Sequence, residues 1–294
     1  MGLINEVKFS DLYITPDKTC YIWSGKTDCG LMTITFDDFP EFLAGLETEY
    51  DGKNCSYLLN YKGRNYRVER TVALQGPQYC ARKMPTTVPD LKDLGIDAGV
   101  YKHLVSLSGA YGLILLAGAT GSGKSTTVSA LLKEYLSLKG GYAFTIEDPI
   151  EYVYEQDQAV IHQREVGKDV CSFTGALRSA LREDPDVILV GEMRDYETIS
   201  AALTAAETGH LVMSTLHTTG AAQTIDRIID ACPAGMQNQV RTQLASVLNG
   251  VITQCLIPNA RGNGRVVATE ILVGTDAVCN QIRENKCHQL GSLM

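Results

Sequence analysis

The chain has 294 residues, 45% of them hydrophobic and 20% charged, and a formal net charge of -8. This balance is typical of a soluble globular protein with room for two domains, and it disfavours an overall basic nucleic-acid-binding surface. The sequence also lacks any apolar run near the roughly 18 residues of a membrane-spanning helix, and the N-terminus lacks a secretory signal.

Residues 1–84 have the pattern of a small mixed α+β domain. Alternating and apolar stretches between glycine-containing turns predict one half-buried sheet with one or two helices. The expected strands are Cys20–Trp23, Leu31–Ile34 and Ser56–Tyr61, the expected helix is Phe36–Leu46, and the turn signals are Asp51-Gly52 and Lys62-Gly63.

A proline-containing segment follows this domain. Pro85 and Pro89 lie close together, and proline removes backbone donors and restricts the residue before it. We therefore expect a linker over residues 85–102, with a short helix at Gly99–Leu107 leading into the second domain.

The pattern then changes to strands that alternate with helices. The run Leu113–Ala117 is continuously apolar, as expected of a strand that is buried on both faces. The alternation predicts a parallel sheet with helices on both faces. The further expected elements are a helix ending near Leu138, strand Tyr142–Ile146, helix Ser172–Leu181, strand Val187–Val190, helix Thr198–Glu207 and strand Leu211–Thr215.

Residues Gly118–Ser125 fit the phosphate-loop pattern Gly-x-x-x-x-Gly-Lys-Ser, between a buried strand and a helix. In this context backbone N–H groups and a helix N-terminus surround phosphate oxygens, Lys124 reaches the β- and γ-phosphates, and Ser125 holds Mg²⁺. The chain should therefore bind ATP with Mg²⁺. The expected nucleotide-binding residues are Gly118, Ala119, Thr120, Gly121, Ser122, Gly123, Lys124, Ser125 and Thr126.

Acidic residues and a histidine follow the strands of this sheet. Glu192 comes just after strand Val187–Val190 and is our candidate for orienting or deprotonating the attacking water. Glu147, Asp148 and Glu151 follow the preceding strand, where several carboxylates at one strand end favour a bound cation. We take Glu151 as a catalytic and Mg²⁺-binding candidate.

Two histidines flank the last strand. His217 lies at its C-terminal end, where it could sense the γ-phosphate or orient a carboxylate, and we count it among the catalytic candidates. His210 lies at the opposite end of the strand, and its expected role is structural.

These motifs, in this order, resemble the PilT-like ATPases of type IV pili and type II/type IV secretion systems. The resemblance covers nearly all of residues 103–290. Ala277–Leu290 is similar to a late motif of pilus retraction motors, with Cys279 and Gln281 in place of the usual Arg and Leu. The matching segments are Gly118–Thr126, Thr145–Glu151, Arg164–Gly167, Ala176–Arg182, Asp184–Asp186, Gly191–Asp195 and Gly209–Thr218.

The resemblance implies a RecA-like P-loop ATPase domain at residues 103–294 and a smaller PAS-like α+β domain at residues 1–84. It also implies a homohexameric ring in which Arg67 and Arg82 reach a nucleotide across domains. Chains of this family usually continue past the position of Met294, so we expect this one to be truncated at its C-terminus.

The expected function is a hexameric motor that couples ATP hydrolysis to type IV pilus retraction or to type IV secretion of the Dot/Icm or plasmid-transfer type. Because no spanning segment is present, we expect a cytoplasmic protein, peripheral at the inner membrane and recruited by an inner-membrane platform protein, with no requirement for nucleic acid.

Two alternatives remain. One is an assembly-type pilus or type II secretion ATPase, although such proteins usually carry an extra N-terminal domain and a four-cysteine zinc motif. The nine cysteines of this chain contain no Cys-x-x-Cys pair, and we interpret them as reduced, mostly buried thiols. The other alternative is a non-catalytic nucleotide-binding regulator, which intact Lys124, Ser125 and Glu192 disfavour.

Overall fold

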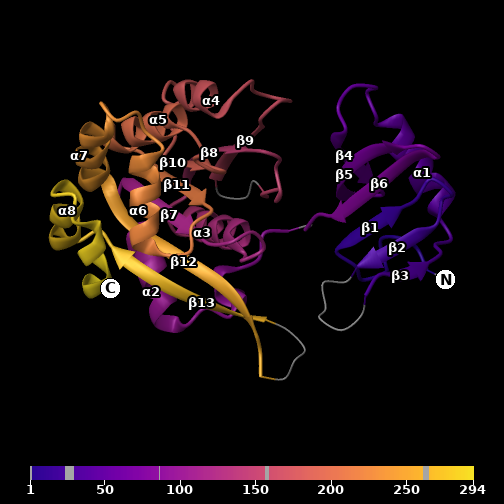
Figure 1. Cartoon of the computed structure of the whole chain (residues 1–294), viewed down its shortest axis with the longest axis horizontal. Helices are drawn as coiled ribbons and strands as arrows, with labels where there is room; N and C mark the ends of the chain where they lie inside the picture. Colours follow the sequence, from indigo (N-terminus) through magenta and orange to yellow (C-terminus); the bar gives the residue numbers. More distant parts are fainter. Residues whose placement is uncertain (1, 24–29, 86, 156–158, 261–264) are drawn as a thin grey trace. The chain divides into compact units, whose positions relative to one another are not determined.

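The computed structural model describes residues 2–23, 30–85, 87–155, 159–260 and 265–294 (Figure 1). The chain divides into two compact units, Met1–Thr86 and Thr87–Met294. Among the described residues, no helix is long and apolar enough to cross a membrane.

The first unit is a six-stranded antiparallel sheet with strand order β3-β2-β1-β6-β5-β4. Helix α1 (Phe39–Thr48) packs on it through the buried side chains of Phe42 and Leu46. The strands are β1 (Asp11–Ile14), β2 (Cys20–Trp23), β3 (Met32–Ile34), β4 (Ser56–Tyr61), β5 (Arg64–Ala73) and β6 (Gly76–Lys83).

Local sequence explains two boundaries in this unit. Lys62 and Gly63 both have positive φ angles, as a two-residue type I′ hairpin turn requires, and they join β4 to β5. Helix α1 begins three residues later than expected, because Phe36 forms a bridge with Gly2 and a proline occupies the first helical turn.

The second unit is a seven-stranded sheet with strand order β13-β12-β7-β11-β10-β8-β9. The six strands from β12 to β9 are parallel and β13 is antiparallel, so the expected parallel sheet is confirmed. Strands β9, β12 and β13 were not expected from the sequence. The strands are β7 (Gly112–Ala117), β8 (Gly141–Glu147), β9 (Ala159–Glu165), β10 (Val187–Val190), β11 (Leu211–Leu216), β12 (Leu248–Pro258) and β13 (Arg265–Val273).

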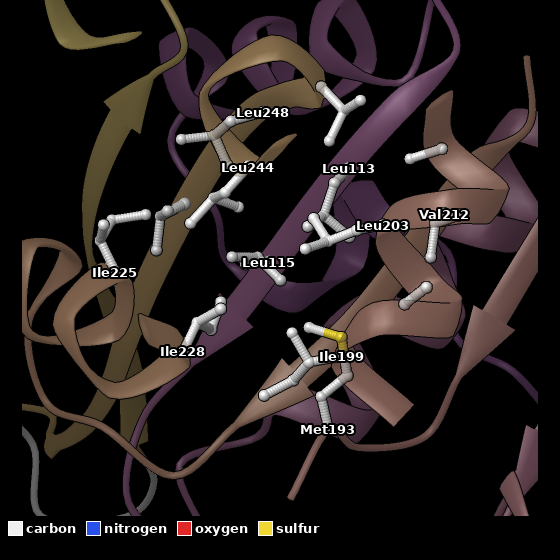
Figure 2. Close-up of a cluster of buried hydrophobic side chains, with 14 of the residues drawn as sticks. Leu113, Leu115, Met193, Ile199, Leu203, Val212, Ile225, Ile228, Leu244 and Leu248 are labelled. Carbon is white, nitrogen blue, oxygen red and sulfur yellow. The ribbon is translucent and has the colours of Figure 1, made fainter. Parts of the chain in front are cut away.

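Helices cover both faces of this sheet, as the sequence predicts. Side chains of β7 alternate between two apolar cores: Leu113 and Leu115 enter one, and Ile114 and Leu116 enter the other. The first core includes α4 (Phe173–Ala180), α5 (Tyr196–Glu207), α6 (Ala221–Asp230), α7 (Gln237–Val247), α8 (Asp276–Arg283) and η2 (Cys287–Leu293); the second includes η1 (Leu91–Leu94), α2 (Ala98–Leu107) and α3 (Lys124–Lys139). Figure 2 shows Leu115 among the side chains of α5, α6 and α7.

Most of the expected linker 85–102 belongs to the second unit. Val88 and Leu91 are buried in its second core, and helix α2 begins at Ala98, capped by the side chain of Asp97. The two prolines restrict the backbone there, but they do not prevent the apolar side chains between and beyond them from packing.

Candidate active site

The phosphate-loop segment joins β7 to α3 and depends on glycine at both of its ends. Gly118 has a φ of +154°, and a Cβ there would lie 2.4 Å from the carbonyl oxygen of Gln254. Gly123 adopts a left-handed conformation with a φ of +88° immediately before α3. A side chain at either position would strain or displace the loop. The backbone of the loop can therefore come close to phosphate oxygens at the N-terminus of α3.

Lys124, the first residue of α3, folds back over this loop. Its Nζ donates to the carbonyl oxygens of Gly118 at 2.8 Å and Ala119 at 3.0 Å. Burial lowers the pKa of Lys124, and the negative charges of Glu151 and Glu192 oppose that shift. Both carboxylates are therefore near enough for their charges to act on the Lys124 ammonium group.

Gln254 supports the loop from the neighbouring strand β12. Its Nε2 donates to the carbonyl oxygen of Ser122 at 2.7 Å, and this amide is buried. A Cβ on Gly123 would lie 3.1 Å from the same nitrogen, so loop and amide are closely packed. The sequence analysis missed Gln254, because only the pairing of β12 with β7 places it under the loop.

Glu192 lies just beyond the C-terminal end of β10, and the phosphate loop begins at the C-terminal end of β7 in the same parallel sheet. Its Oε1 pairs with a guanidinium nitrogen of Arg194 at 2.6 Å, and its Oε2 lies 3.5 Å from Nε2 of His217. The Glu192 side chain is 12% exposed, whereas that of His217 is 50% exposed. The sequence analysis expected His217 either to sense the γ-phosphate or to orient a carboxylate, and in the structure its ring lies beside Glu192. Arg194 is a charged partner of Glu192 that the sequence analysis did not single out.

The backbone near Glu192 is held by its neighbours. The amide of Gly191 donates to the carbonyl oxygen of Ile146 at 2.8 Å, and the hydroxyl of Thr215 donates to the carbonyl oxygen of Gly191 at 2.6 Å. These bonds tie the end of β10 to the ends of β8 and β11, so the site residues share one rigid sheet edge.

The acidic cluster after β8 separates into different environments. Glu147 is 7% exposed and accepts hydrogen bonds from the Thr145 hydroxyl at 2.7 Å and from Nε2 of Gln163 at 3.2 Å. Burial raises the pKa of Glu147. Asp148 is exposed and Glu151 is half-buried. Glu147 is therefore an internal, hydrogen-bonded carboxyl group, and Glu151 is the member of the cluster whose charge acts on Lys124.

His210 lies at the other end of β11 and is 8% exposed. Its Nδ1 hydrogen-bonds with the carbonyl oxygen of Ala205 at 3.0 Å and lies 3.2 Å from the hydroxyl of Thr208. These contacts fasten the end of α5 to the start of β11, a structural role that agrees with the expectation.

Arg67 and Arg82 lie in the first unit, directly opposite each other on β5 and β6. Directly opposed residues of antiparallel strands point to the same face, so two positive charges are adjacent. Nε of Arg82 donates to Oδ1 of Asp11 at 2.7 Å, and Asp11 is 2% exposed. Arg67 has a weaker contact, 4.0 Å from Glu69. The structure thus pairs the two arginines on one sheet face.

Comparison with known proteins identifies relatives of similar sequence. The chain is 49% identical over 229 residues to a twitching motility protein of Neisseria gonorrhoeae, and this match covers 78% of the chain and 60% of that protein. It is 48% identical over 255 residues to the type IV pilus retraction ATPase PilT of Pseudomonas aeruginosa, covering 87% of the chain and 70% of that protein.

Two solved structures extend the likeness to the whole fold. A pilus retraction motor PilT with bound ADP superposes with a TM-score of 0.86 at 39% identity, over 99% of this chain and 86% of that one. The ATPase DotB of Legionella pneumophila superposes with a TM-score of 0.79 at 28% identity, over 97% of this chain and 82% of that one.

The model of one protein family matches residues 53–292, which include the arginine pair, the phosphate loop, Glu151, Glu192 and His217. With this match and these relatives, the chain belongs to the type II/IV secretion system protein family.

Proposed function

We propose that this chain hydrolyses ATP. The observation that carries the proposal is that Lys124 is bound within the phosphate loop at the start of α3, with Glu151 and Glu192 near enough for their charges to act on it. A cation held within a glycine-rich loop binds phosphate groups, and carboxylates beside it provide a base for water and a metal ligand. Nucleotide binding alone would require Lys124 and the loop but not the two carboxylates.

Each residue has a separate role in the proposed reaction. Loop amides and Lys124 bind the β- and γ-phosphates, and Glu192 orients the attacking water and accepts its proton. Arg194 and His217, which contact the two oxygens of Glu192, hold its carboxylate in place. His217 is half exposed, so it can also contact the terminal phosphate.

The donor set also fits Mg²⁺. Mg²⁺ is usually held by one or two protein oxygens together with substrate phosphates, rather than by a full protein cage. Within the described parts of the chain, no group of three or more His, Cys, Asp or Glu side chains could hold a metal ion. Ser125 and Glu151 would hold Mg²⁺, which neutralises phosphate charge during the reaction.

At the level of the whole protein, we propose a homohexameric motor for type IV pilus retraction. The relatives named for retraction and twitching motility are 48% and 49% identical, whereas the DotB structure is 28% identical. This difference favours retraction over Dot/Icm-type secretion. The motor would act in the cytoplasm at the inner membrane, on a platform protein of the pilus apparatus.

The proposed PAS-like unit contributes the arginine pair. Arg67 and Arg82, acting from a neighbouring subunit, stabilise the γ-phosphate charge when the ring closes around ATP. Contacts between the γ-phosphate and both domains then favour one domain orientation, and phosphate release removes that preference.

The test combines phosphate release with solution mass. We expect Mg²⁺-dependent phosphate release from ATP that stops with EDTA, together with a hexameric mass when nucleotide is present. No release from the folded parent protein at micromolar concentration refutes hydrolysis. Release at full rate from a strict monomer refutes the motor and leaves an ATPase. Failure to restore twitching to a strain that lacks its retraction ATPase refutes the retraction assignment.

A further inference from the structure

Glu151 lies on an irregular segment, residues 148–155, that follows β8 and has no strand or helix of its own. A charge on such a segment keeps a fixed position only if side chains from elsewhere bind the backbone around it. The segment has this support on both sides of Glu151. Oε2 of Glu165, the last residue of β9, accepts from the backbone amide of Ile150 at 3.2 Å, and two further side chains, from β9 and from the end of β8, bind the backbone at and after Glu151.

Gln163 of β9 is the first of these side chains. Its Nε2 donates to the carbonyl oxygen of Tyr152 at 2.8 Å, and its Oε1 accepts from the backbone amide of Tyr154 at 3.1 Å. The same Nε2 reaches Oε1 of Glu147 at 3.2 Å. One amide group thus joins the backbone just after Glu151 to the buried carboxyl group at the end of β8.

Glu147, at the end of β8, is the second of these side chains. The backbone N–H of Glu151 lies close enough to this carboxyl group to lower its pKa, against the rise caused by burial. Thr145, which pairs in register with Gln163 across β8 and β9, donates its hydroxyl to the same carboxyl group. Glu147 is therefore the fixed centre of the arrangement, and Gln163 connects it to the backbone beyond Glu151.

The segment is also joined to the phosphate-loop helix. The hydroxyl of Tyr152, a residue that is 5% exposed, hydrogen-bonds with the hydroxyl of Thr126 at 2.9 Å. Thr126 is the third residue of α3, two positions after Lys124. Hydrogen bonds thus connect the backbone next to Glu151 to α3 through Tyr152 and Thr126, and to β8 and β9 through Glu147 and Gln163.

We propose that Gln163 is a positioning residue for ATP hydrolysis, which acts by holding Glu151 at the phosphate loop. It touches no expected substrate atom, and its effect passes through the backbone on either side of Glu151. The kinetic consequence of this inference rests on the proposed ATPase function. The hydrogen bonds that Gln163 makes to the 148–155 segment can be tested without turnover.

The first experiment measures amide hydrogen exchange in Gln163→Met. Methionine keeps the length of the side chain and removes its donor and its acceptor. The Tyr152 carbonyl loses its donor and the Tyr154 amide loses its acceptor, so exchange of the peptide spanning residues 148–155 should speed up by at least about 3- to 10-fold. The same change at Gln243, whose Nε2 donates to Glu207 on the surface, should leave this peptide unchanged. Unaltered exchange in Gln163→Met overturns the proposal, whether or not the protein hydrolyses ATP.

The second experiment measures phosphate release and nucleotide binding. Outer-shell partners of this kind typically contribute about 10- to 100-fold to activity, so kcat of Gln163→Met should fall by that factor. The Kd for ATP should stay within about threefold, because the phosphate-loop contacts of Lys124 are untouched. Gln243→Met should keep the parental rate. An unchanged kcat, or a loss of binding instead of turnover, overturns the proposal.

A double-mutant cycle separates positioning from general damage. If Gln163 acts through Glu151, adding Gln163→Met to Glu151→Gln should cost less than about threefold further. An equal loss in both backgrounds overturns the proposal. Should Gln163→Met not fold, Glu147→Met, which removes the acceptor of the Thr145 and Gln163 hydrogen bonds, tests the same support of the 148–155 segment, with the same faster exchange and reduced kcat expected. An inactive parent protein refutes the proposed hydrolysis, and the exchange experiment alone then decides this inference.

Discussion

Replacing Glu192 with glutamine removes its capacity to accept a proton and leaves its surroundings almost unchanged. The amide oxygen can accept from Arg194, as Oε1 does at 2.6 Å, and the amide nitrogen can donate to Nε2 of His217, which lies 3.5 Å from Oε2. The Arg194 side chain is 71% exposed, so loss of this ion pair should change stability by no more than about 1 kcal/mol. Any large effect on turnover would therefore be chemical.

The expected loss is large. Removing a general base of this kind costs about 10²- to 10⁴-fold in rate, which corresponds to roughly 2.7–5.4 kcal/mol in activation free energy. Nucleotide affinity should be kept or increased, because one negative charge near Lys124 and the phosphates is removed. Single-turnover phosphate release and titration with a fluorescent ATP analogue measure the two quantities. Glu197→Gln, the same change at an exposed residue of the following helix, is the matched control. A Glu192→Gln rate within threefold of the parent refutes the assignment.

Three further changes test other parts of the site. Lys124→Ala should abolish detectable nucleotide binding, and unchanged affinity in the same titration would refute the placement of the phosphates. Gln254→Met should raise the Kd for ATP by about 3- to 10-fold, because one buried hydrogen bond to Ser122 is lost; a change in kcat alone would contradict a binding role. Arg67→Ala should lower turnover by about 10³-fold or more if Arg67 stabilises the γ-phosphate charge. Its contact with Glu69 is long, so the melting temperature should hardly change.

The sequence alone was sufficient to predict the site residues that follow the C-terminal ends of the parallel strands. A continuously apolar run predicts a strand buried on both faces, and the residue after such a strand lies at the carboxyl edge of the sheet. This reasoning placed the phosphate loop after β7, Glu192 after β10 and His217 after β11. No long-range pairing had to be known, because all parallel strands end at the same edge.

The sequence was not sufficient where side chains distant in the chain meet. Glu147 and Glu151 look alike in sequence, but Glu147 is buried and accepts a hydrogen bond from Gln163, which is 16 residues away. Gln254 is separated from Ser122 by 132 residues, and its contact depends on the register of β12 against β7. Local propensity carries no information about such register, so these supports could be found only in the folded structure.

The two glutamines lie on opposite sides of the site, and this placement has a measurable consequence. In the sheet order, β12 and β9 flank the strands that carry the catalytic candidates; Gln254 on β12 binds the phosphate loop, and Gln163 on β9 binds the segment of Glu151. An amide both donates and accepts without adding charge, so it can fix backbone beside Lys124 and the carboxylates without altering their electrostatics.

Because the side chains of Gln163 and Gln254 share no partner in these hydrogen bonds, the effects of changing them should be independent. The double variant with both glutamines changed to methionine should combine the raised Kd and the reduced kcat of the single variants, within about 0.5 kcal/mol of additivity. A larger coupling would mean that the phosphate loop and the Glu151 segment move as one unit, and it would contradict separate support of the two.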